Sequence, residues 1–440
     1  MPRMSVRISL LASLISVTFL IAPVAFAKSR DKHRLPPRDT SGVDHIIVVM
    51  MENRSFDHLL GWHPTADAQN QELSYPDPDN GGVVVPTQQL SALVPPDYMG
   101  CGHPDPDHSW EGGRTQLNGG LMNGFLAGTN DAYAIGYYAE ADRPFHSALA
   151  SEFTTFDRFF SSTLGETFAN RFFMHAAQTD RLENSLDLST LPTIWDRLIA
   201  KGVSARYYFS DVSFLWLWGA KYLPISRTYQ QFLDDAEAGT LPAVAFVDPR
   251  FIDEATGTSG DDHPHADIRV GDAFLAEVFH ALSTGPDWES TVLIVTYDEW
   301  GGFFDHVPPP RAAAPNAVDP DIVAGKALLG FRVPVVVASP FTRGDPASPK
   351  VNSQVYDNTS ILKLIEWRWN LQPLTARDAS SDVGNLAFAL DFKNRDPSVP
   401  ALPLPDAPDV VPCLPAPPSL EIGLSSLLAL FPLGPTAPAQ

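Results

Sequence analysis

Short apolar runs alternate with segments of helical spacing along most of the chain. Five of the runs are almost continuously apolar, as in strands that helices cover on both faces. They occupy residues 46–50, 205–209, 243–247, 291–297 and 333–338. Residues 193–200, 267–282 and 359–369 repeat apolar side chains at helical intervals, and Asp267 and Asn358 stand where they can cap the second and third of these helices. The pattern predicts an α/β sandwich with a mostly parallel central sheet.

Two segments interrupt this alternation. Residues 64–106 are rich in Pro, Asp, Gly and Asn, which predicts a long loop excursion over the surface. Residues 400–440 contain 11 prolines in 41 positions and no Lys or Arg, a composition that cannot close a core of its own. We therefore expect a tail, whose apolar stretch at residues 422–430 packs on the body or on a partner.

The first 27 residues have the features of a secretory signal. Arg3 and Arg7 precede an apolar run from residue 8 to residue 26, which ends in the small-x-small pattern Ala25-Phe26-Ala27. Cleavage there predicts a mature chain that begins at Lys28 and is secreted or periplasmic. The competing interpretation is an uncleaved membrane anchor. No later segment is long and apolar enough to span a bilayer, so we expect no transmembrane segment in the mature chain.

Charge and length limit the classes of function. The formal net charge is −22, and removal of Arg3 and Arg7 changes it to −24 (−22 − 2). Such a chain repels nucleic acid and anionic membrane surfaces, so nucleic acid is not an expected partner. The remaining 413 residues (440 − 27) suit one large domain with excursions, or a domain with an added lobe.

Only two cysteines occur, Cys101 and Cys413. Export to an oxidising compartment favours a disulfide between them, which would tie the tail to the body. Two unpaired thiols are the alternative, because a sequence does not show whether two Cα atoms approach within about 7 Å.

Acidic and amide side chains follow two of the predicted strands. Glu52 and Asn53 come directly after the first, and Asp298 and Glu299 follow the strand at 291–297. Ligands of open α/β sheets bind beyond the carboxyl ends of strands, and oxygen donors there suit a divalent cation. Without a cation, each pair of carboxylates 4 Å apart would cost on the order of 4 kcal/mol. The alternatives are that Glu52 and Asn53 cap a helix near Ser55, and that the acids spread separately into solvent.

A hydroxyl stands before another helical pattern. Thr167 follows a β-like run at 153–156 and precedes the helical segment 171–178. Backbone N–H groups at a helix start favour an anion, so a phosphoryl group could lie against Thr167, with Asn170 and Arg171 nearby. For an isolated threonine, a simple N-cap is the alternative.

Four of the twelve histidines lie in polar loops beside carboxylates. They are His108, His263, His265 and His306. Such residues suit metal binding, phosphate binding or proton transfer to a leaving group, although a single loop histidine is usually only solvated. His175 and His280 fall within helical patterns and are expected to pack.

Four motifs in order resemble the bacterial phospholipase C and acid phosphatase phosphoesterase family, to which plant non-specific phospholipases C also belong. The motifs are Glu-Asn-Arg-Ser-Phe-Asp at 52–57, Thr-x-x-Asn-Arg at 167–171, His-Pro-x-x-Asp at 263–267 and Asp-Glu-x-Gly-Gly-x-x-Asp-His at 298–306. The match extends from Val43 to Trp369. Two positions depart from the family's pattern, since Ala169 replaces a usual Pro and Trp300 a frequent His. Neither change removes a proposed catalytic atom.

The resemblance implies an alkaline-phosphatase-like α/β/α sandwich with long loop excursions. It implies a phosphoesterase catalytic domain over 28–398, after a signal peptide at 1–27 and before a Pro-rich tail at 399–440. Thr167 would be the nucleophile, bridging metal and phosphorus. The implied metal ligands are Glu52, Asn53, Thr167, Asp298 and Glu299. Asn170 and Arg171 are expected to bind phosphate, and the catalytic histidines would be His108, His263, His265 and His306.

The expected function is an exported, metal-dependent phosphoric-ester hydrolase that acts through a covalent phosphothreonine. A catalytically inactive, metal-stabilised surface or binding protein of the same fold is the alternative. A sulfatase would need a convertible Cys followed by Pro and Arg, which Cys101-Gly102-His103 does not provide.

The substrate and the metal are less defined by the sequence. The substrate is a phosphate monoester or a diester, phospholipids included. Aromatic residues between Tyr207 and Tyr222 either border a lipid or choline-like group or belong to the core. The expected cofactor is a divalent ion, Ca, Mg or Mn where ligation is by oxygen alone, and Zn where a histidine contributes.

Overall fold

The computed structural model describes residues 35–414 and 422–430 of the chain. The predicted signal peptide lies outside the described residues. Among the described residues, no helix has both the length and the apolar character needed to span a membrane.

The centre of the structure is an eight-stranded sheet with the order β15-β6-β14-β11-β1-β10-β8-β9. Its strands are β1 (His45–Met51), β6 (Thr154–Phe156), β8 (Ala205–Phe209), β9 (Ser226–Thr228), β10 (Val244–Asp248), β11 (Thr291–Tyr297), β14 (Val336–Ala338) and β15 (Lys350–Asn352). Five of the seven pairings are parallel, and β14 pairs antiparallel with both neighbours. The predicted mostly parallel sheet is therefore confirmed.

One predicted strand differs in length. The run at 333–338 forms a strand only over Val336–Ala338. Pro334 has no N–H to donate to a ladder, so the chain before β14 makes only isolated hydrogen bonds to β6 and β7. Phe156 N donates to Val335 O at 3.0 Å, and Val333 N donates to Phe159 O at 3.0 Å.

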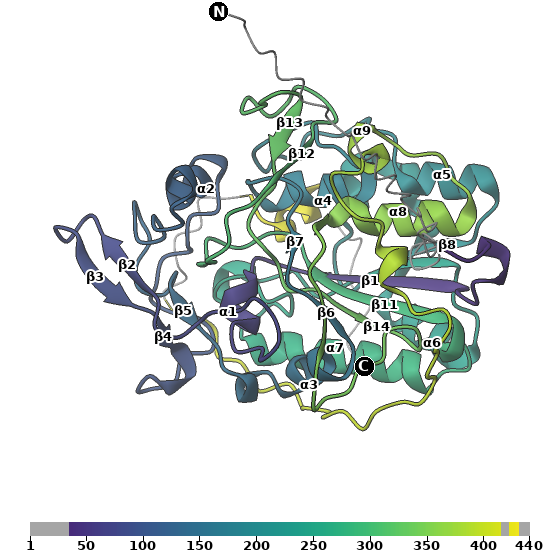
Figure 1. Cartoon of the computed structure of the whole chain (residues 1–440), viewed down its shortest axis with the longest axis horizontal. Coiled ribbons are helices and arrows are strands. Elements are labelled where there is room, and N and C mark those ends of the chain that lie inside the picture. The colour runs from purple at the N-terminus through teal and green to yellow at the C-terminus, as the bar shows by residue number, and fades with distance from the viewer. Residues whose placement is uncertain (1–34, 415–421, 431–440) are drawn as a thin grey trace, which may run out of the picture. The chain divides into compact units, whose positions relative to one another are not determined.

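Helices cover both faces of the sheet, as Figure 1 shows. One face carries α3 (Pro144–Glu152), α6 (Tyr229–Ala238) and α7 (Ile268–Thr284), and the other carries α4 (Thr167–Ala176), α5 (Ile194–Lys201), α8 (Asn358–Trp369) and α9 (Ala376–Ala379). The predicted α/β/α architecture is thus confirmed. Asp267 caps α7 as predicted, because its side chain accepts from Arg269 N. The predicted cap at Asn358 is wrong, since Asp357 accepts from Thr359 N and Asn358 is already helical.

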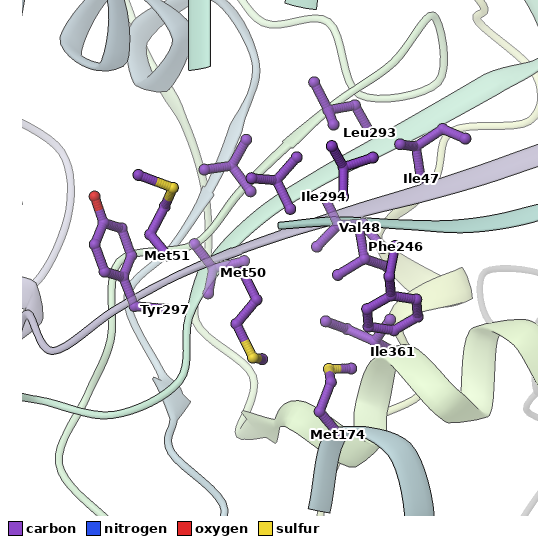
Figure 2. Close-up of a cluster of buried hydrophobic side chains, with 14 of the residues drawn as sticks. Ile47, Val48, Met50, Met51, Met174, Phe246, Leu293, Ile294, Tyr297 and Ile361 are labelled. Carbon is purple, nitrogen blue, oxygen red and sulfur yellow. The ribbon is translucent and has the colours of Figure 1, made fainter. Parts of the chain in front are cut away.

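The core is built from the alternating side chains of the central strands. Figure 2 shows Met50 and Phe246 on the same side of the sheet as Met174 of α4 and Ile361 of α8, with Met51 on the opposite side. The aromatic side chains proposed as a lipid border belong to this core. Tyr207, Tyr208, Phe214, Trp216, Trp218 and Tyr222 are all at most 6% exposed.

Smaller elements lie beyond the end of the sheet where β1 stops. These are α1 (Phe56–Leu60), the hairpin of β2 (Ser74–Asp77) and β3 (Val83–Pro86), the pair β4 (Gln88–Gln89) and β5 (Gly136–Tyr137), and α2 (Trp110–Leu117). Short strands also pair as β7 (Phe159–Phe160) with β16 (Tyr356–Asp357), and as β12 (Arg311–Ala313) with β13 (Lys326–Leu328). Val84 and Val94, 60% and 99% exposed, confirm that the predicted excursion runs over the surface.

A disulfide holds the tail to the body. Cys101 is bonded to Cys413 with a Cα–Cα distance of 5.3 Å, which confirms the predicted pair. Cys413 N also donates to Thr256 O at 2.9 Å. Further on, Leu424 and Leu427 of a 3-10 helix (Leu424–Ala429) are fully buried, so residues 422–430 pack on the body.

Replacing Cys101 and Cys413 together by serine should lower the free energy of unfolding by about 2–4 kcal/mol, because the long loop between them gains freedom in the unfolded chain. Urea unfolding of the two proteins measures the difference. Two thiols that alkylate in the native protein without prior reduction would contradict the bond.

Candidate active site

The site is assembled where β1 and β11 end side by side. Met51 and Tyr297 are register partners in the parallel pair, so the next residues, Glu52 and Asp298, leave the sheet together. Asp298 N donates to Met51 O at 3.2 Å, and Asn53 N donates to Asp298 Oδ1 at 3.1 Å. The predicted meeting of the two acidic strand ends is therefore present in the structure.

Backbone conformation brings the two loops into contact. Asn53 has φ 57, in the left-handed region that asparagine tolerates better than most residues. Gly301, at φ 62, faces it so closely that a Cβ would lie 2.0 Å from Asn53 O. Only glycine fits there, so Gly301 sets how closely the β11 loop approaches Asn53.

Thr167 meets these loops from the opposite side. Its helix α4 begins at Thr167 itself, four residues earlier than the predicted 171–178, and Glu166 is the N-cap without a side-chain capping bond. Thr167 Oγ1 donates toward Glu52 Oε1 at 3.2 Å and Asn53 Oδ1 at 3.1 Å. The hydroxyl is therefore the point where the helix and the first strand end join, and a simple N-cap role is excluded.

Asn170 and Arg171 support the site from within α4. Asn170 Nδ2 donates to the carbonyl oxygens of Thr163 and Gly165, and its Oδ1 accepts from Thr163 N. Arg171 Nε donates to Asp298 Oδ2 at 2.9 Å, and Nη1 lies 3.6 Å from Asp248 Oδ1. The described contacts of both side chains are thus to the protein, where they hold the loop before Thr167 and one acid of β11.

Two of the predicted histidines lie at this cluster. His108 is buried, and its Nε2 lies 3.1 Å from Asn53 Nδ2 and 3.9 Å from Glu299 Oε1. Its Nδ1 lies 2.8 Å from Pro106 O, which leaves Nε2 as the acceptor for the Asn53 amide. The ring of His263 packs edge-on to it with centroids 6.2 Å apart, and His263 Nε2 lies 3.8 Å from Asp105.

The other two predicted histidines have different surroundings. His265 Nε2 lies 3.1 Å from His103 O, and burial lowers the pKa of its ring. His306 binds Asp57 through Nδ1, and its Nε2 lies 3.1 Å from Asp67. The described hydrogen bonds of His265 and His306 therefore do not join them to Thr167.

The site concentrates buried negative charge. Burial, and then the carboxylates of Glu254, Asp298 and Asp261, raise the pKa of Glu52 well above its usual range. Burial also raises the pKa of Asp298, against the attraction of Arg171. Among the described residues, Glu52 Oε2 is buried and has no hydrogen-bond partner. Carboxylate and amide oxygens crowded in this way fit a hard divalent cation, which would stabilise their charged forms.

Three acids of the cluster were missed from the sequence. Asp248 ends β10, so the rule used for the other strand ends could have found it. Asp261 lies just before the His-Pro motif, and Glu52 N donates to its carbonyl at 2.9 Å. Glu254 lies in a short 3-10 helix (Glu254–Thr256), and only the fold brings it here.

Comparison with known proteins gives one family over most of this chain. The model of the phosphoesterase family matches residues 43–372. Non-specific phospholipase C1 of Arabidopsis thaliana is 31% identical over 432 residues, covering 88% of this chain and 76% of the relative. Phospholipase C B of Mycobacterium tuberculosis is 31% identical over 468 residues, covering 86% of this chain and 84% of the relative.

Solved structures give a more distant likeness. A protein in the alkaline phosphatase superfamily from Vibrio parahaemolyticus has a TM-score of 0.39 at 10% identity, covering 80% of this chain and 71% of that one. The lipoteichoic acid synthase LtaP from Listeria monocytogenes has a TM-score of 0.40 at 10% identity, covering 79% of this chain and 76% of that one.

Gly301→Ala should destabilise the protein by about 3 kcal/mol or more. An alanine in the left-handed conformation is strained, and its Cβ would also clash with Asn53. Gly119→Ala is the control: Gly119 has φ +65, but a Cβ added there would meet no atom within 4 Å, so about 1–2 kcal/mol is expected. Urea unfolding compares them. Equal losses would show that the approach of Gly301 to Asn53 does not constrain the site.

Proposed function

This chain belongs to the phosphoesterase family, and we propose that it is an exported, metal-dependent hydrolase of phosphoric esters that forms a covalent phosphothreonine at Thr167. Hydrolysis of phosphoric ester bonds is the activity of the family. The position of Thr167 Oγ1, within 3.2 Å of oxygens of both Glu52 and Asn53, supports the finer proposal most directly.

Thr167 is placed to attack phosphorus. Its Oγ1 lies 3.2 Å from Glu52 Oε1 and 3.1 Å from Asn53 Oδ1, and its proton passes to solvent as the Oγ1–phosphorus bond forms and the ester bond to the leaving group breaks. Thr167 is also the first residue of α4, where the helix dipole favours an anion. The oxygen of a water molecule then bonds to phosphorus, the bond from phosphorus to Oγ1 breaks, a proton from that water returns to Oγ1, and the phosphorylated product leaves.

A proton must reach the departing oxygen in the first step. We assign this proton to His263, whose ring packs edge-on to His108 and whose Nδ1 lies 2.9 Å from Pro264 O. Asp105 Oδ2 lies 3.8 Å from Nε2 of this ring. His108 then orients the Asn53 amide whose oxygen faces Thr167.

Glu52, Asn53, Asp298 and Glu299 would hold the metal together with Thr167. When bound, a divalent cation lowers the pKa of a hydroxyl and offsets negative charge that develops on the phosphoryl oxygens. The oxygen-rich donor set favours Ca, Mg or Mn over Zn.

The substrate proposed is a phosphodiester of the phospholipid class. The relatives that match most of this chain carry the name phospholipase C. The rates of hydrolysis of phosphatidylcholine, bis-p-nitrophenyl phosphate and p-nitrophenyl phosphate show whether the substrate is a phospholipid, another diester or a monoester.

Export is supported by two features of this chain. The predicted signal at residues 1–27 directs secretion, and the Cys101–Cys413 bond is typical of an oxidising compartment.

Asp298→Asn should lose the catalytic metal and activity together, because it removes a charged donor but keeps the shape of the side chain. Metal affinity should fall by at least about 100-fold. Elemental analysis after dialysis measures the metal, and p-nitrophenyl esters report turnover. Stoichiometric metal with normal turnover in this variant would remove Asp298 from the ligand set.

Thr167→Ala should lower turnover by roughly 10³ to 10⁶-fold while the fold and most metal affinity remain, because the attacking oxygen is absent. Thr167→Ser should keep measurable activity, since that oxygen survives. Rapid acid quench with a ³²P-labelled substrate should trap phosphothreonine at position 167.

Two results would replace this mechanism. Normal turnover by Thr167→Ala without label on any residue would favour direct attack by water. Absence of all phosphoesterase activity in wild-type protein loaded with Ca, Mg, Mn or Zn would favour an inactive binding protein of the same fold.

A further inference from the structure

Glu52 also belongs to a second group of acids, together with Glu254 and Asp261. One carboxylate oxygen each of Glu52, Glu254 and Asp261 lies within 4.8 Å of the other two. All three side chains are at most 4% exposed. They come from the end of β1, the short 3-10 helix at Glu254–Thr256 and the loop that carries His263.

In each of the three acids, one carboxylate oxygen accepts a hydrogen bond from the protein, and the other has no hydrogen-bond partner among the described residues. Glu52 Oε1 accepts from Thr167, Glu254 Oε2 accepts from Ser425 Oγ at 3.3 Å, and Asp261 Oδ1 accepts from Ser259 Oγ and His263 N. Within the described part of the chain, Glu52 Oε2, Glu254 Oε1 and Asp261 Oδ2 are buried and make no hydrogen bond. Three such oxygens are costly to bury without a positive charge.

The guanidinium of Arg171 does not supply that charge by a hydrogen bond. Arg171 attracts Glu52 and Glu254 electrostatically, but its Nε hydrogen bond is to Asp298. Elsewhere in the protein, a comparable group of Asp57, Asp305 and His306 is compensated directly. Arg332 Nη2 lies 3.0 Å from Asp57 Oδ1, and Arg332 Nε lies 2.9 Å from Asp305 Oδ1. The Glu52 group has the acids of such a cluster without its arginine.

We propose that Glu52, Glu254 and Asp261 form a second divalent-cation site, distinct from the catalytic one and specific for hard, oxygen-binding ions such as Ca²⁺ or Mn²⁺. The three carboxylates supply the charge, and water completes the coordination that three ligands leave open. The site goes beyond the proposed function: it needs neither Thr167 nor Asp298, although Glu52 contributes to both sites through different oxygens.

The site would couple the tail to the catalytic loop. Glu254 is held by Ser425 of the tail, and Cys413 N donates to Thr256 O in the same 3-10 helix. Asp261 accepts from His263 N, so an ion bound to Asp261 also fixes the backbone of the proposed proton donor. The role we assign to this cation is therefore to position His263 and to hold the disulfide-bonded tail in place.

The test counts ions in full-length protein after chelation and dialysis against Ca²⁺ or Mn²⁺. Wild type should retain two equivalents and Glu254→Gln one, because the amide keeps the shape of the side chain and removes a charge. Asp253→Asn is the matched control: it makes the same change one residue away on a side chain that is 54% exposed, and should retain two. Asp298→Asn should lose the catalytic ion and keep the second.

The unfolding temperature gives a second readout, because the effect of Glu254→Gln on it should differ without and with a cation. Without a cation, Glu254→Gln should unfold at a higher temperature than wild type, since one of three crowded charges is gone. With saturating Ca²⁺, wild type should gain more than the variant, because only wild type fills both sites. An equal gain in the two proteins would overturn the second site.

Gly423→Ala displaces the carboxylate without changing its charge. A Cβ there would lie within 2.2 Å of Glu254 Oε2, so this variant too should retain one equivalent. Glu254→Gln and Gly423→Ala that both bind as many ions as wild type would contradict the proposal. If wild type binds a single ion that Asp298→Asn loses and Glu254→Gln keeps, the second site is overturned and the catalytic site stands. If Glu254→Gln loses that ion and Asp298→Asn keeps it, the catalytic assignment is overturned instead.

Discussion

The arrangement of this protein depends on how buried negative charge is compensated at the ends of β1 and β11. Glu52, Asp298 and Glu299 leave neighbouring parallel strands and are at most 1% exposed. A parallel sheet with helices on both faces excludes water from this edge, so the acids cannot be screened by solvent. Arg171 pairs with Asp298, and the rest of the charge calls for a cation. The same excess of charge that destabilises these acids would favour binding of a metal.

The backbone around these acids is shaped to keep them together. Asn53 adopts a left-handed conformation, Gly301 lets the β11 loop approach it, and Asp298 accepts from two backbone N–H groups, those of Asn53 and Glu299. These bonds favour the ionised form of Asp298 and hold it before any ligand arrives. Preorganisation of this kind reduces the reorganisation that binding a cation or a phosphoryl group would otherwise require.

Much of the fold could be predicted from the sequence, because it follows from the pattern of neighbouring residues. Continuous apolar runs gave the central strands, and Asp267 marked the start of α7 correctly. The antiparallel pairing of β14 could not be predicted, because the direction of a strand pair depends on a partner far away in the sequence. The later start of β14 was also missed, although Pro334 indicates that a strand does not run through it. Cys101 and Cys413 were a pair by count alone, whereas their approach to 5.3 Å is a property of the folded chain.

The site divides in the same way. Strand ends predicted Glu52 and Asp298 as neighbours because parallel strands bring their carboxyl ends to one edge. Nothing local distinguishes His263, which faces His108 near Thr167, from His306, which binds Asp57 in a different acidic group. The difference between those groups is an arginine: Arg332 contacts the acids around His306 and offsets their charge within the chain. Around Glu52, the described residues show no guanidinium hydrogen-bonded to Glu254 or Asp261, and Arg171 acts on Glu52 only electrostatically. An acidic cluster is therefore better judged as a ligand site by the guanidinium that it lacks than by the carboxylates that it contains, and that property appears only once the chain is folded.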